Sequence, residues 1–180
     1  MRIIGGVLRG KRILAPKNLP VRPTTDFAKE GLFNILNNLI DFDDCNVLDL
    51  FSGTGNIALE FASRGAKKVT AIDMHSPCLN FIRDTAKAFK LNSIFVERAD
   101  VFKYLEKAHN SYDIIFADPP YELENIASIF DLVFKNNLLQ DNGLLIIEHS
   151  SKTNLSDKAY FLYTRKYGNV HFSFFKNKVD

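Results

Sequence analysis

The most specific chemical feature of the chain is the sequence Asp118-Pro119-Pro120-Tyr121. The two prolines fix the backbone, so that the Asp118 carboxylate and the Pro119 carbonyl become rigid hydrogen-bond acceptors. Tyr121 adds a ring face on which a planar base can stack. Two acceptors beside a ring suit an exocyclic amine on a heterocycle and direct its nitrogen lone pair at an electrophile, which is catalysis by positioning. The alternative interpretation is a plain proline-rich turn after a strand.

A second feature, from Val47 to Ile57, combines an apolar run, a glycine turn and a helix start. Gly53 and Gly55 let the backbone pass close to a ligand, and the helix N-terminus offers unpaired N–H groups. The spacing formally fits G-x-G-x-x-A, and Asp73 follows Gly53 by twenty residues, so a nicotinamide oxidoreductase is an alternative. Asp49 argues against it, because an acid before the turn repels a pyrophosphate and suits a cationic ligand end, such as an amino acid's ammonium.

Two further acids stand at or just beyond expected strand ends. Asp73 can accept two hydrogen bonds from a ribose diol, or it can cap the next helix, where Ser76 competes for that role. Asp100 can accept from an adenine amino group or cap a short helix. With Asp49 and Asp118, these residues mark the carboxyl ends of four successive strands. Ligands of open parallel sheets bind at such ends.

Hydrophobic periodicity predicts the elements that position these acids. Strands are expected at 46–51, 68–73, about 93–97, 112–117 and 143–148, and helices at 55–64, from Ser76, after Asp100 and over about 123–136. The runs Tyr160–Thr164 and Val170–Phe175 predict a C-terminal hairpin with an antiparallel strand. The predicted fold class is therefore α/β, with a Rossmann-like, mostly parallel sheet covered on both faces.

The first forty residues carry most of the positive charge. Seven basic residues oppose Asp26 and Glu30, giving +5, whereas the whole chain has +2 and the remaining 140 residues therefore sum to −3. The seven are Arg2, Arg9, Lys11, Arg12, Lys17, Arg22 and Lys29. A basic arm on a mildly acidic body predicts either a polyanion partner or a solvated basic edge.

The sequence of this basic arm also predicts its secondary structure. Short β-prone runs at 2–4 and 12–14 flank a glycine-rich turn and predict a hairpin, and three prolines predict a loop over 15–24. A helix should follow, capped by Thr25 or Asp26 and burying Leu32, Leu36 and Leu39 on one face.

The bulk composition is that of a soluble globular protein. The 180 residues, 46% hydrophobic and 24% charged, suffice for one domain with a sizeable core and a small appendage. No apolar run reaches the length of a membrane span and the N-terminus lacks a signal-peptide pattern, so we expect a cytoplasmic protein without a membrane partner. Cys45 and Cys78 lack metal-ligand spacing, so we expect reduced thiols and no metal.

The motifs resemble a known family. The sequence D-L-F-S-G-T-G at 49–55, followed by Asp73, Asp100 and D-P-P-Y at 118–121, is similar to the motif series of class I S-adenosylmethionine-dependent methyltransferases. Four segments resemble, more narrowly, the bacterial 16S rRNA guanine-N2 methyltransferases of the RsmD type. They are R-I-I-G-G-x-x-R-G at 2–10, R-P-T-T-D at 22–26, L-F-N-I-L at 32–36 and L-E-F-A-S-R-G-A at 59–66.

The resemblance implies a seven-stranded methyltransferase domain over 41–180, preceded by a basic extension over 1–40 that helps to grip rRNA. It implies methyl transfer from S-adenosylmethionine to the N2 amine of a guanine in 16S rRNA, within the small ribosomal subunit or its assembly intermediate. We expect a monomer. The residues implied are Asp49, Phe51, Gly53, Gly55, Asp73, Met74, Asp100 and Val101 for the cofactor, Asp118, Pro119 and Tyr121 for the flipped guanine, and Arg2, Arg9, Lys11, Arg12, Arg22, Thr24 and Thr25 for rRNA.

The chain departs from the family pattern at three positions. Phe27 replaces a usually basic residue, Gly31 replaces Ala or Ser, and Asp73 stands where Glu is more frequent. These departures bear on RNA contacts rather than on the reaction. Two further alternatives remain, a DNA adenine-N6 methyltransferase, which also uses D-P-P-Y, and a non-catalytic RNA-binding or assembly module. The first would have little room for a separate sequence-reading domain within 180 residues.

Overall fold

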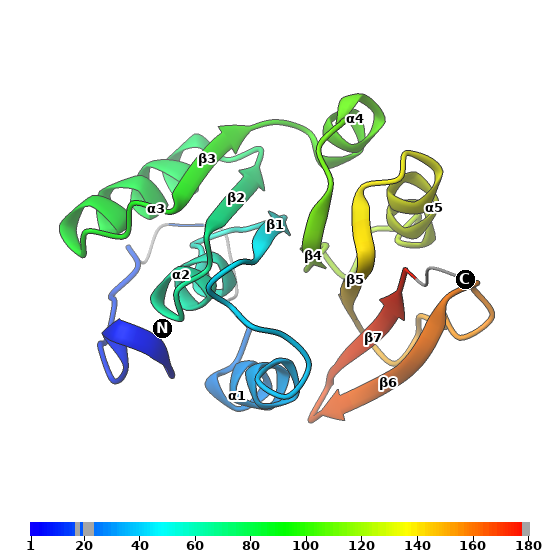
Figure 1. Cartoon of the computed structure of the whole chain (residues 1–180), viewed down its shortest axis with the longest axis horizontal. Helices are drawn as coiled ribbons and strands as arrows, with labels where there is room; N and C mark the ends of the chain where they lie inside the picture. The colour runs from blue at the N-terminus through cyan, green and yellow to red at the C-terminus, as the bar shows by residue number, and fades with distance from the viewer. Residues whose placement is uncertain (17–18, 20–23, 178–180) are drawn as a thin grey trace.

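A computed structural model describes residues 1–16, 19 and 24–177. Its centre is a seven-stranded sheet with the strand order β3-β2-β1-β4-β5-β7-β6 (Figure 1). The strands are β1 (Asn46–Leu50), β2 (Lys68–Asp73), β3 (Ile94–Arg98), β4 (Tyr112–Ala117), β5 (Leu139–His149), β6 (Phe161–Tyr167) and β7 (Val170–Lys176). The first five are parallel to one another, and β7 is antiparallel to both β5 and β6. The predicted mostly parallel sheet with an antiparallel C-terminal strand is confirmed.

The strand order reverses beside β1, which is where a ligand site is expected. From β1 the chain moves outward to β2 and β3, and then returns to place β4 on the other side of β1. Crevices at such switch points open at the carboxyl ends of the strands. The register pairs Asp49 with Phe116 and Leu50 with Ala117, so the ends of β1 and β4 are level.

Helices cover both faces of the sheet, as the uniformly apolar strands predict. They are η1 (Gly6–Leu8), α1 (Asp26–Leu36), α2 (Asn56–Ser63), α3 (Ser76–Ala88), α4 (Val101–Lys107) and α5 (Ala127–Lys135). Alternate strand residues divide into two buried clusters: Val47 and Ile114 pack with α1, α2 and α3, whereas Leu48 and Ile115 pack with α4 and α5. Figure 1 shows these two helical layers on opposite sides of the strands.

Several element boundaries differ from the sequence prediction. The N-terminal hairpin is reduced to a single antiparallel bridge between Arg2 and Arg12, because η1 occupies its connection. The helix α1 ends at Leu36, which leaves Leu39 outside it and 51% exposed. The N-cap of α3 is His75 rather than Ser76, since Ser76 is already the first helical residue.

The basic extension shares its core with the rest of the chain. Ile3 and Ile13 are buried in the same cluster as Leu32 of α1 and Phe61 of α2. The proposed division into 1–40 and 41–180 stays a prediction.

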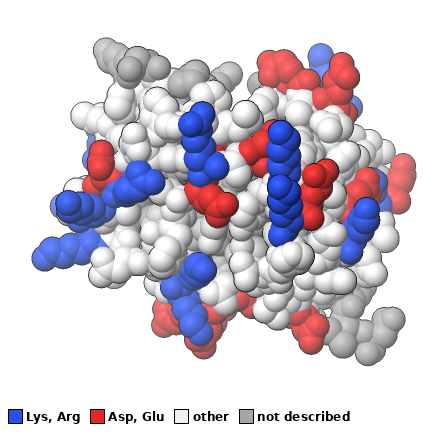
Figure 2. Space-filling model, turned by 90° about the horizontal axis from the view of Figure 1, so that it is seen from above, with Lys and Arg blue, Asp and Glu red and all other residues white. Residues whose placement is uncertain are grey.

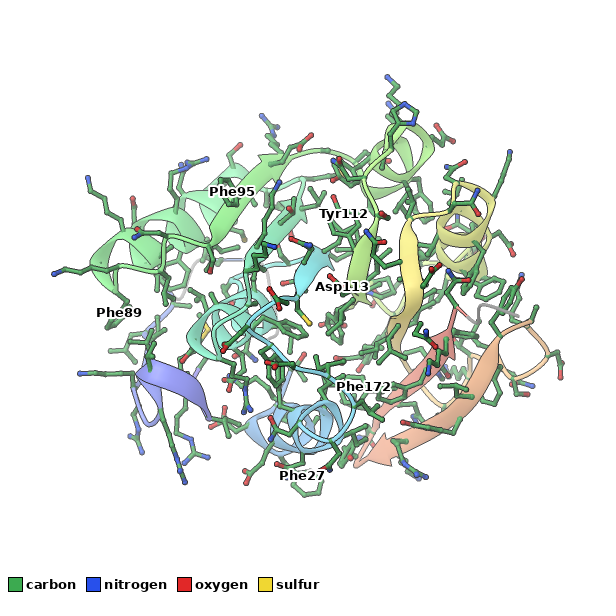
Figure 3. The ribbon with its side chains drawn as sticks, in the orientation of Figure 1. Phe27, Phe89, Phe95, Tyr112, Asp113 and Phe172 are labelled. Carbon is green, nitrogen blue, oxygen red and sulfur yellow. The ribbon has the colours of Figure 1, made fainter. Side chains whose placement is uncertain are left out.

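Two of the family departures meet at one contact. A Cβ atom at Gly31 would lie 2.1 Å from the Cε1 atom of Tyr167, at the end of β6, so the tyrosine ring occupies the space that an alanine needs. The Phe27 ring meets the same Tyr167 ring edge-on, with centroids 5.7 Å apart. In Figure 3, Phe27 lies on the outer side of α1, whereas Phe172 lies on the sheet that α1 covers. Gly31 therefore lets α1 approach the β6–β7 hairpin.

Candidate active site

The predicted glycine turn joins the end of β1 to α2 and is tied to β2. The Ser52 N–H donates to the Ile72 carbonyl at 3.0 Å, and the Gly53 N–H donates to Asp73 Oδ2 at 2.8 Å. On the other side, the Asp118 N–H donates to the Leu50 carbonyl at 3.3 Å. Three of the acids expected at strand ends are thus gathered around one turn, namely Asp49, Asp73 and Asp118.

The turn requires an unusual backbone. Gly53 and Gly55 have φ values of 52° and 76°, and a Cβ at Gly55 would lie 2.7 Å from a side-chain carbon of Ile82 on α3. Phe51 is also left-handed, with φ 59°, although it is not glycine. Such a residue costs about 1–3 kcal/mol, and strain of this kind clusters at ligand sites. Phe51 packs edge-on against Phe102, with centroids 6.4 Å apart.

Asp49 lies buried beneath the turn. Its Oδ2 accepts the Ala58 N–H at 3.0 Å. Burial, opposed by the Ala58 N–H and assisted by the charge of the nearby Asp73, raises the pKa of Asp49 to about 8. A cationic ligand end would favour the ionised carboxylate, which agrees with the expected methionine ammonium.

Asp73 and Asp100 both serve as backbone acceptors. Asp73 Oδ1 accepts the His75 N–H at 2.8 Å while Oδ2 accepts from Gly53. Oδ1 also lies 3.1 Å from His75 Nδ1, so the second lone pair of Oδ2 is the acceptor that remains for a ribose hydroxyl. Asp100 caps α4 by accepting the Lys103 N–H at 3.0 Å. Of the two neighbours expected at the cofactor, Met74 is exposed and Val101 is buried.

The D-P-P-Y motif follows β4 directly and meets two residues from elsewhere in the chain. Pro119 is buried and Tyr121 is half exposed. The Thr24 hydroxyl lies 3.5 Å from Asp118 Oδ2 and donates to Glu148 Oε2 at 3.0 Å. The Tyr121 hydroxyl donates to Glu148 Oε1 at 3.4 Å. The motif is therefore part of a four-residue group that joins the N-terminal extension to the ends of β4 and β5.

Sequence reasoning missed Glu148, although a signal for it existed. Glu148 comes near the end of the apolar run 143–148, as the other site acids follow theirs. It is 3% exposed and sits on β5, the parallel neighbour of β4. The pKa of Asp118 is raised well above its usual range by burial, then by the charges of Glu148 and Asp49, while the Thr24 hydroxyl opposes the rise. Burial also raises the pKa of Glu148, against the Thr24 and Tyr121 hydroxyls.

The residues expected to contact rRNA have different surroundings. Arg9, Lys11 and Arg12 are exposed, and Arg2 forms an ion pair with Asp26 at 3.3 Å. Arg22 lies outside the described residues. The two threonines have intramolecular roles: Thr24 contacts the carboxylates, and the Thr25 hydroxyl accepts the Ala28 N–H at 3.2 Å as the expected cap of α1.

A second group that sequence reasoning missed attaches the extension to α2. Glu60 is fully buried and accepts the Ile4 and Gly5 N–H groups at 2.9 and 2.8 Å. It also pairs with Lys29 at 3.1 Å and Arg64 at 2.9 Å. Lys29, counted above among the arm's cations, is itself fully buried. It is therefore not available to a polyanion.

The described residues contain neither a membrane-spanning helix nor a metal-binding cluster. None of their helices is long and apolar enough to cross a bilayer. Across the same part of the chain, no group of three or more His, Cys, Asp and Glu side chains is arranged to hold a metal ion.

Comparisons with known proteins identify the family. The family model described as conserved hypothetical protein 95 matches residues 1–176. Ribosomal RNA small subunit methyltransferase D of Buchnera aphidicola subsp. Baizongia pistaciae is 35% identical, over 86% of this chain and 78% of the relative. The protein of that name from Haemophilus influenzae is 33% identical, over 82% and 78%. The chain belongs to the ribosomal RNA small subunit methyltransferase D family. The solved Escherichia coli structure yhhF, 27% identical, superposes with a TM-score of 0.86 over 100% of this chain and 99% of that one.

As a member of the methyltransferase D family, the chain is a methyltransferase whose cofactor is S-adenosylmethionine. The site fits this cofactor in two respects. The left-handed Gly53 and Gly55 have no side chain, so a ligand can approach the backbone of the turn closely. The buried Asp49 offers a carboxylate for the cationic methionine end. The assignment of individual residues to parts of the cofactor stays a prediction.

Proposed function

We propose that this methyltransferase D family member transfers the methyl group of S-adenosylmethionine to the exocyclic N2 amine of a guanine in 16S rRNA. The observation that carries the proposal is the D-P-P-Y motif, placed at the end of β4 directly beside the glycine turn after β1. The names of the relatives, which are small-subunit rRNA methyltransferases, support the same substrate. When bound, the cofactor supplies an electrophilic methyl group on a sulfonium.

We assign residues at the carboxyl edge of the sheet to the three parts of the cofactor. Asp49, Phe51, Gly53 and Gly55 would line the methionine part of the cofactor. Asp73 and Met74 would lie along the ribose, and Asp100 and Val101 along the adenine. These positions follow the carboxyl edge of the sheet from β1 to β3, in the order in which an extended cofactor would cross it.

Asp118, Pro119 and Tyr121 would hold the acceptor. The target base leaves its stack, which costs a few kcal/mol, and its ring lies on Tyr121. The Asp118 carboxylate and the Pro119 carbonyl accept the two N2 hydrogens, so the nitrogen lone pair faces the methyl group. As the N–C bond forms and the C–S bond breaks, the amine nitrogen gains positive charge beside Asp118. The amine then releases one proton, which leaves to solvent.

The exposed Arg9, Lys11 and Arg12 would contact rRNA phosphates. The small ribosomal subunit or its assembly intermediate is the proposed partner, and a monomer in the cytoplasm is the proposed state. Figure 2 shows one face of the molecule, over whose described part Lys/Arg and Asp/Glu side chains are interspersed. A surface of mixed sign attracts a polyanion less than a basic arm does.

The first test replaces Asp118 with alanine. We expect a loss of methylation of at least about a hundredfold, because the positioned acceptor disappears. Calorimetry should show nearly unchanged S-adenosylmethionine affinity. Asp141→Ala, at an exposed acid of β5, is the matched control and should retain wild-type activity. Wild-type methylation by Asp118→Ala would exclude the role given to this residue.

A deletion strain separates the proposal from its alternatives. Nucleoside mass spectrometry should show the loss of one N2-methylguanine from 16S rRNA, and primer extension should locate it. Loss of N6-methyladenine from DNA with unchanged rRNA would favour the DNA methyltransferase instead. No transfer of tritiated methyl groups to small subunits or free rRNA would favour the non-catalytic module.

A further inference from the structure

Glu148 is close to the proposed acceptor site but has no role in it so far. It follows Ile147, which pairs with Ala117 across the β4–β5 ladder, and Ala117 directly precedes Asp118. The two carboxylates thus come from adjacent strand ends, with the Thr24 hydroxyl between them, 3.0 Å from Glu148 and 3.5 Å from Asp118. Tyr121, the proposed stacking residue, reaches the other oxygen of Glu148.

The hydrogen-bonding edge of guanine matches two neighbouring acceptors. Guanine presents its N1–H and its N2 amine side by side, and both are donors. Adenine presents its N6 amine beside N1, which is an acceptor. Burial raises the pKa values of both acids in the free protein, and two donors on an incoming base favour the ionised form of both. Ionised carboxylates only accept hydrogen bonds, so two of them in a row fit guanine, whereas one would face the N1 lone pair of adenine.

We infer that Glu148 accepts the N1–H of the target guanine while Asp118 accepts from its N2 amine, which makes Glu148 the residue that selects guanine over adenine. The inference rests on the proposed function, since it assumes that the base binds at Asp118. The Thr24 and Tyr121 hydroxyls donate to different oxygens of Glu148, whereas an amide has only one oxygen that can accept. The hydroxyl contacts and the second acceptor beside Asp118 therefore both require an acid at this position.

The contacts of Glu148 orient it for this role. Each of its oxygens accepts one hydroxyl in the structure and has a further lone pair for an incoming donor. Because Glu148 is buried, a base that leaves it without a donor loses a full hydrogen bond in a dry environment. Sites built to bind a substrate N–H reject analogues that lack it far more strongly than apolar pockets reject a missing methylene.

The test changes the hydrogen-bonding group at N1 from a donor to an acceptor. Small subunits are reconstituted from 16S rRNA ligated with guanine, or with 2-aminopurine, at the methylated position. 2-Aminopurine retains the N2 amine, lacks the C6 oxygen of guanine and has an acceptor at N1, and the Glu148→Gln variant separates the effect at N1 from the loss of the C6 oxygen. We expect the wild-type enzyme to methylate 2-aminopurine at least about a hundredfold more slowly than guanine. In Glu148→Gln, the amide N–H can donate to N1 of 2-aminopurine, so the two rates should come within roughly tenfold of each other.

Controls make each outcome decisive. Glu106→Gln, an exposed acid on α4, should retain the wild-type ratio. Thermal unfolding and S-adenosylmethionine calorimetry show whether Glu148→Gln is folded. If it is folded and retains the wild-type ratio, Glu148 does not face N1. If wild type methylates both bases equally, the inference fails whatever the variant does, although the proposed function stands. If wild type leaves guanine unmethylated, both fail.

Discussion

Two buried glutamates in this protein have opposite surroundings. Glu60 on α2 is surrounded by donors, since it pairs with the cations of Lys29 and Arg64 and accepts two backbone N–H groups. Glu148 on β5 contacts two hydroxyls and lies beside a second acid, Asp118. Among the described residues, no ion pair involves Asp49, Asp118 or Glu148. A buried acid that is paired with cations attaches the N-terminal extension. The buried acids without a cation have raised pKa values, and they mark the place where a ligand supplies the donors.

The two groups are connected through Thr24. The ammonium of Lys29 donates to Asn56 Oδ1 at 2.9 Å, and Asn56 Nδ2 donates to the Thr24 carbonyl at 2.9 Å. The Thr24 hydroxyl then contacts the carboxylates of Glu148 and Asp118. The extension therefore has a structural task within the site, because the ion pairs of Glu60 hold the backbone from which Thr24 reaches the acids.

The largest effect on stability is expected from Lys29→Met. The change removes a cation from beside Glu60, and it leaves the Arg2 carbonyl and Asn56 without their donor. Breaking a buried pair in this way costs about 3–5 kcal/mol. Urea unfolding should show that loss. Methylation by the folded fraction should also fall, because Thr24 loses its support.

The paired variant Lys29→Met/Glu60→Gln makes the comparison sharper. In the single variant Glu60 retains only Arg64 as a cation, and Glu60→Gln removes its charge while leaving an oxygen that can accept a backbone N–H, so part of the lost stability should return. If the single variant loses less than about 1 kcal/mol, the ion pair is not what attaches the extension.

The second prediction concerns pH and the unpaired acids. Burial raises the pKa of Glu148 to about 7 and that of Asp49 to about 8, and raises that of Asp118, so above about pH 5 the folded state holds more protons than the unfolded one. Stability therefore falls as the pH rises from about 5 to about 8. The share of Glu148 is about 2–3 kcal/mol at about 1.36 kcal/mol per pKa unit.

Urea unfolding across this pH range measures the effect. Glu148→Gln should show a shallower decline than wild type, whereas Glu106→Gln should follow wild type. The groups around Glu148 are Asp118, Thr24 and Tyr121, and Asp49 acts on Asp118. A wild-type stability that rises steadily over the range would show that the acids are compensated in solution.

Much of this site could be predicted from the sequence because its signals are local. A glycine turn after an apolar run, and D-P-P-Y after another, each lie within a few residues, and the parallel sheet brings their strand ends together. Glu148 also comes at the end of an apolar run, but only its hydrogen-bond partners identify it as a residue of the site. Those partners are Thr24, 124 residues away, and Tyr121, 27 residues away. No periodicity encodes such contacts.

The extension was harder to predict for the same reason. Charge counting treated Lys29 as part of a basic surface, whereas Glu60, 31 residues along the chain, draws it into the core. Gly31 was seen only as a departure from a family pattern, since the sequence does not show that the ring of Tyr167 occupies the space above it. Burial and long-range pairing decide both positions, and neither follows from local pattern.

The smallest effect on stability is expected on the outer side of the same extension. Arg9, Lys11 and Arg12 are exposed, so replacing all three with alanine should change the free energy of unfolding by less than about 0.5 kcal/mol. Binding to small subunits should nevertheless weaken, and the slope of log affinity against log salt should fall by about 2, because roughly 0.7 counterions are released per single-strand phosphate contact. Filter binding over a salt series measures the slope, with the exposed pair Lys87 and Lys90 of the α3 region replaced as a control. An unchanged slope would show that Arg9, Lys11 and Arg12 are ordinary solvated surface residues that do not contact RNA. The role of the extension would then be structural, through the buried contacts of Lys29 and Thr24.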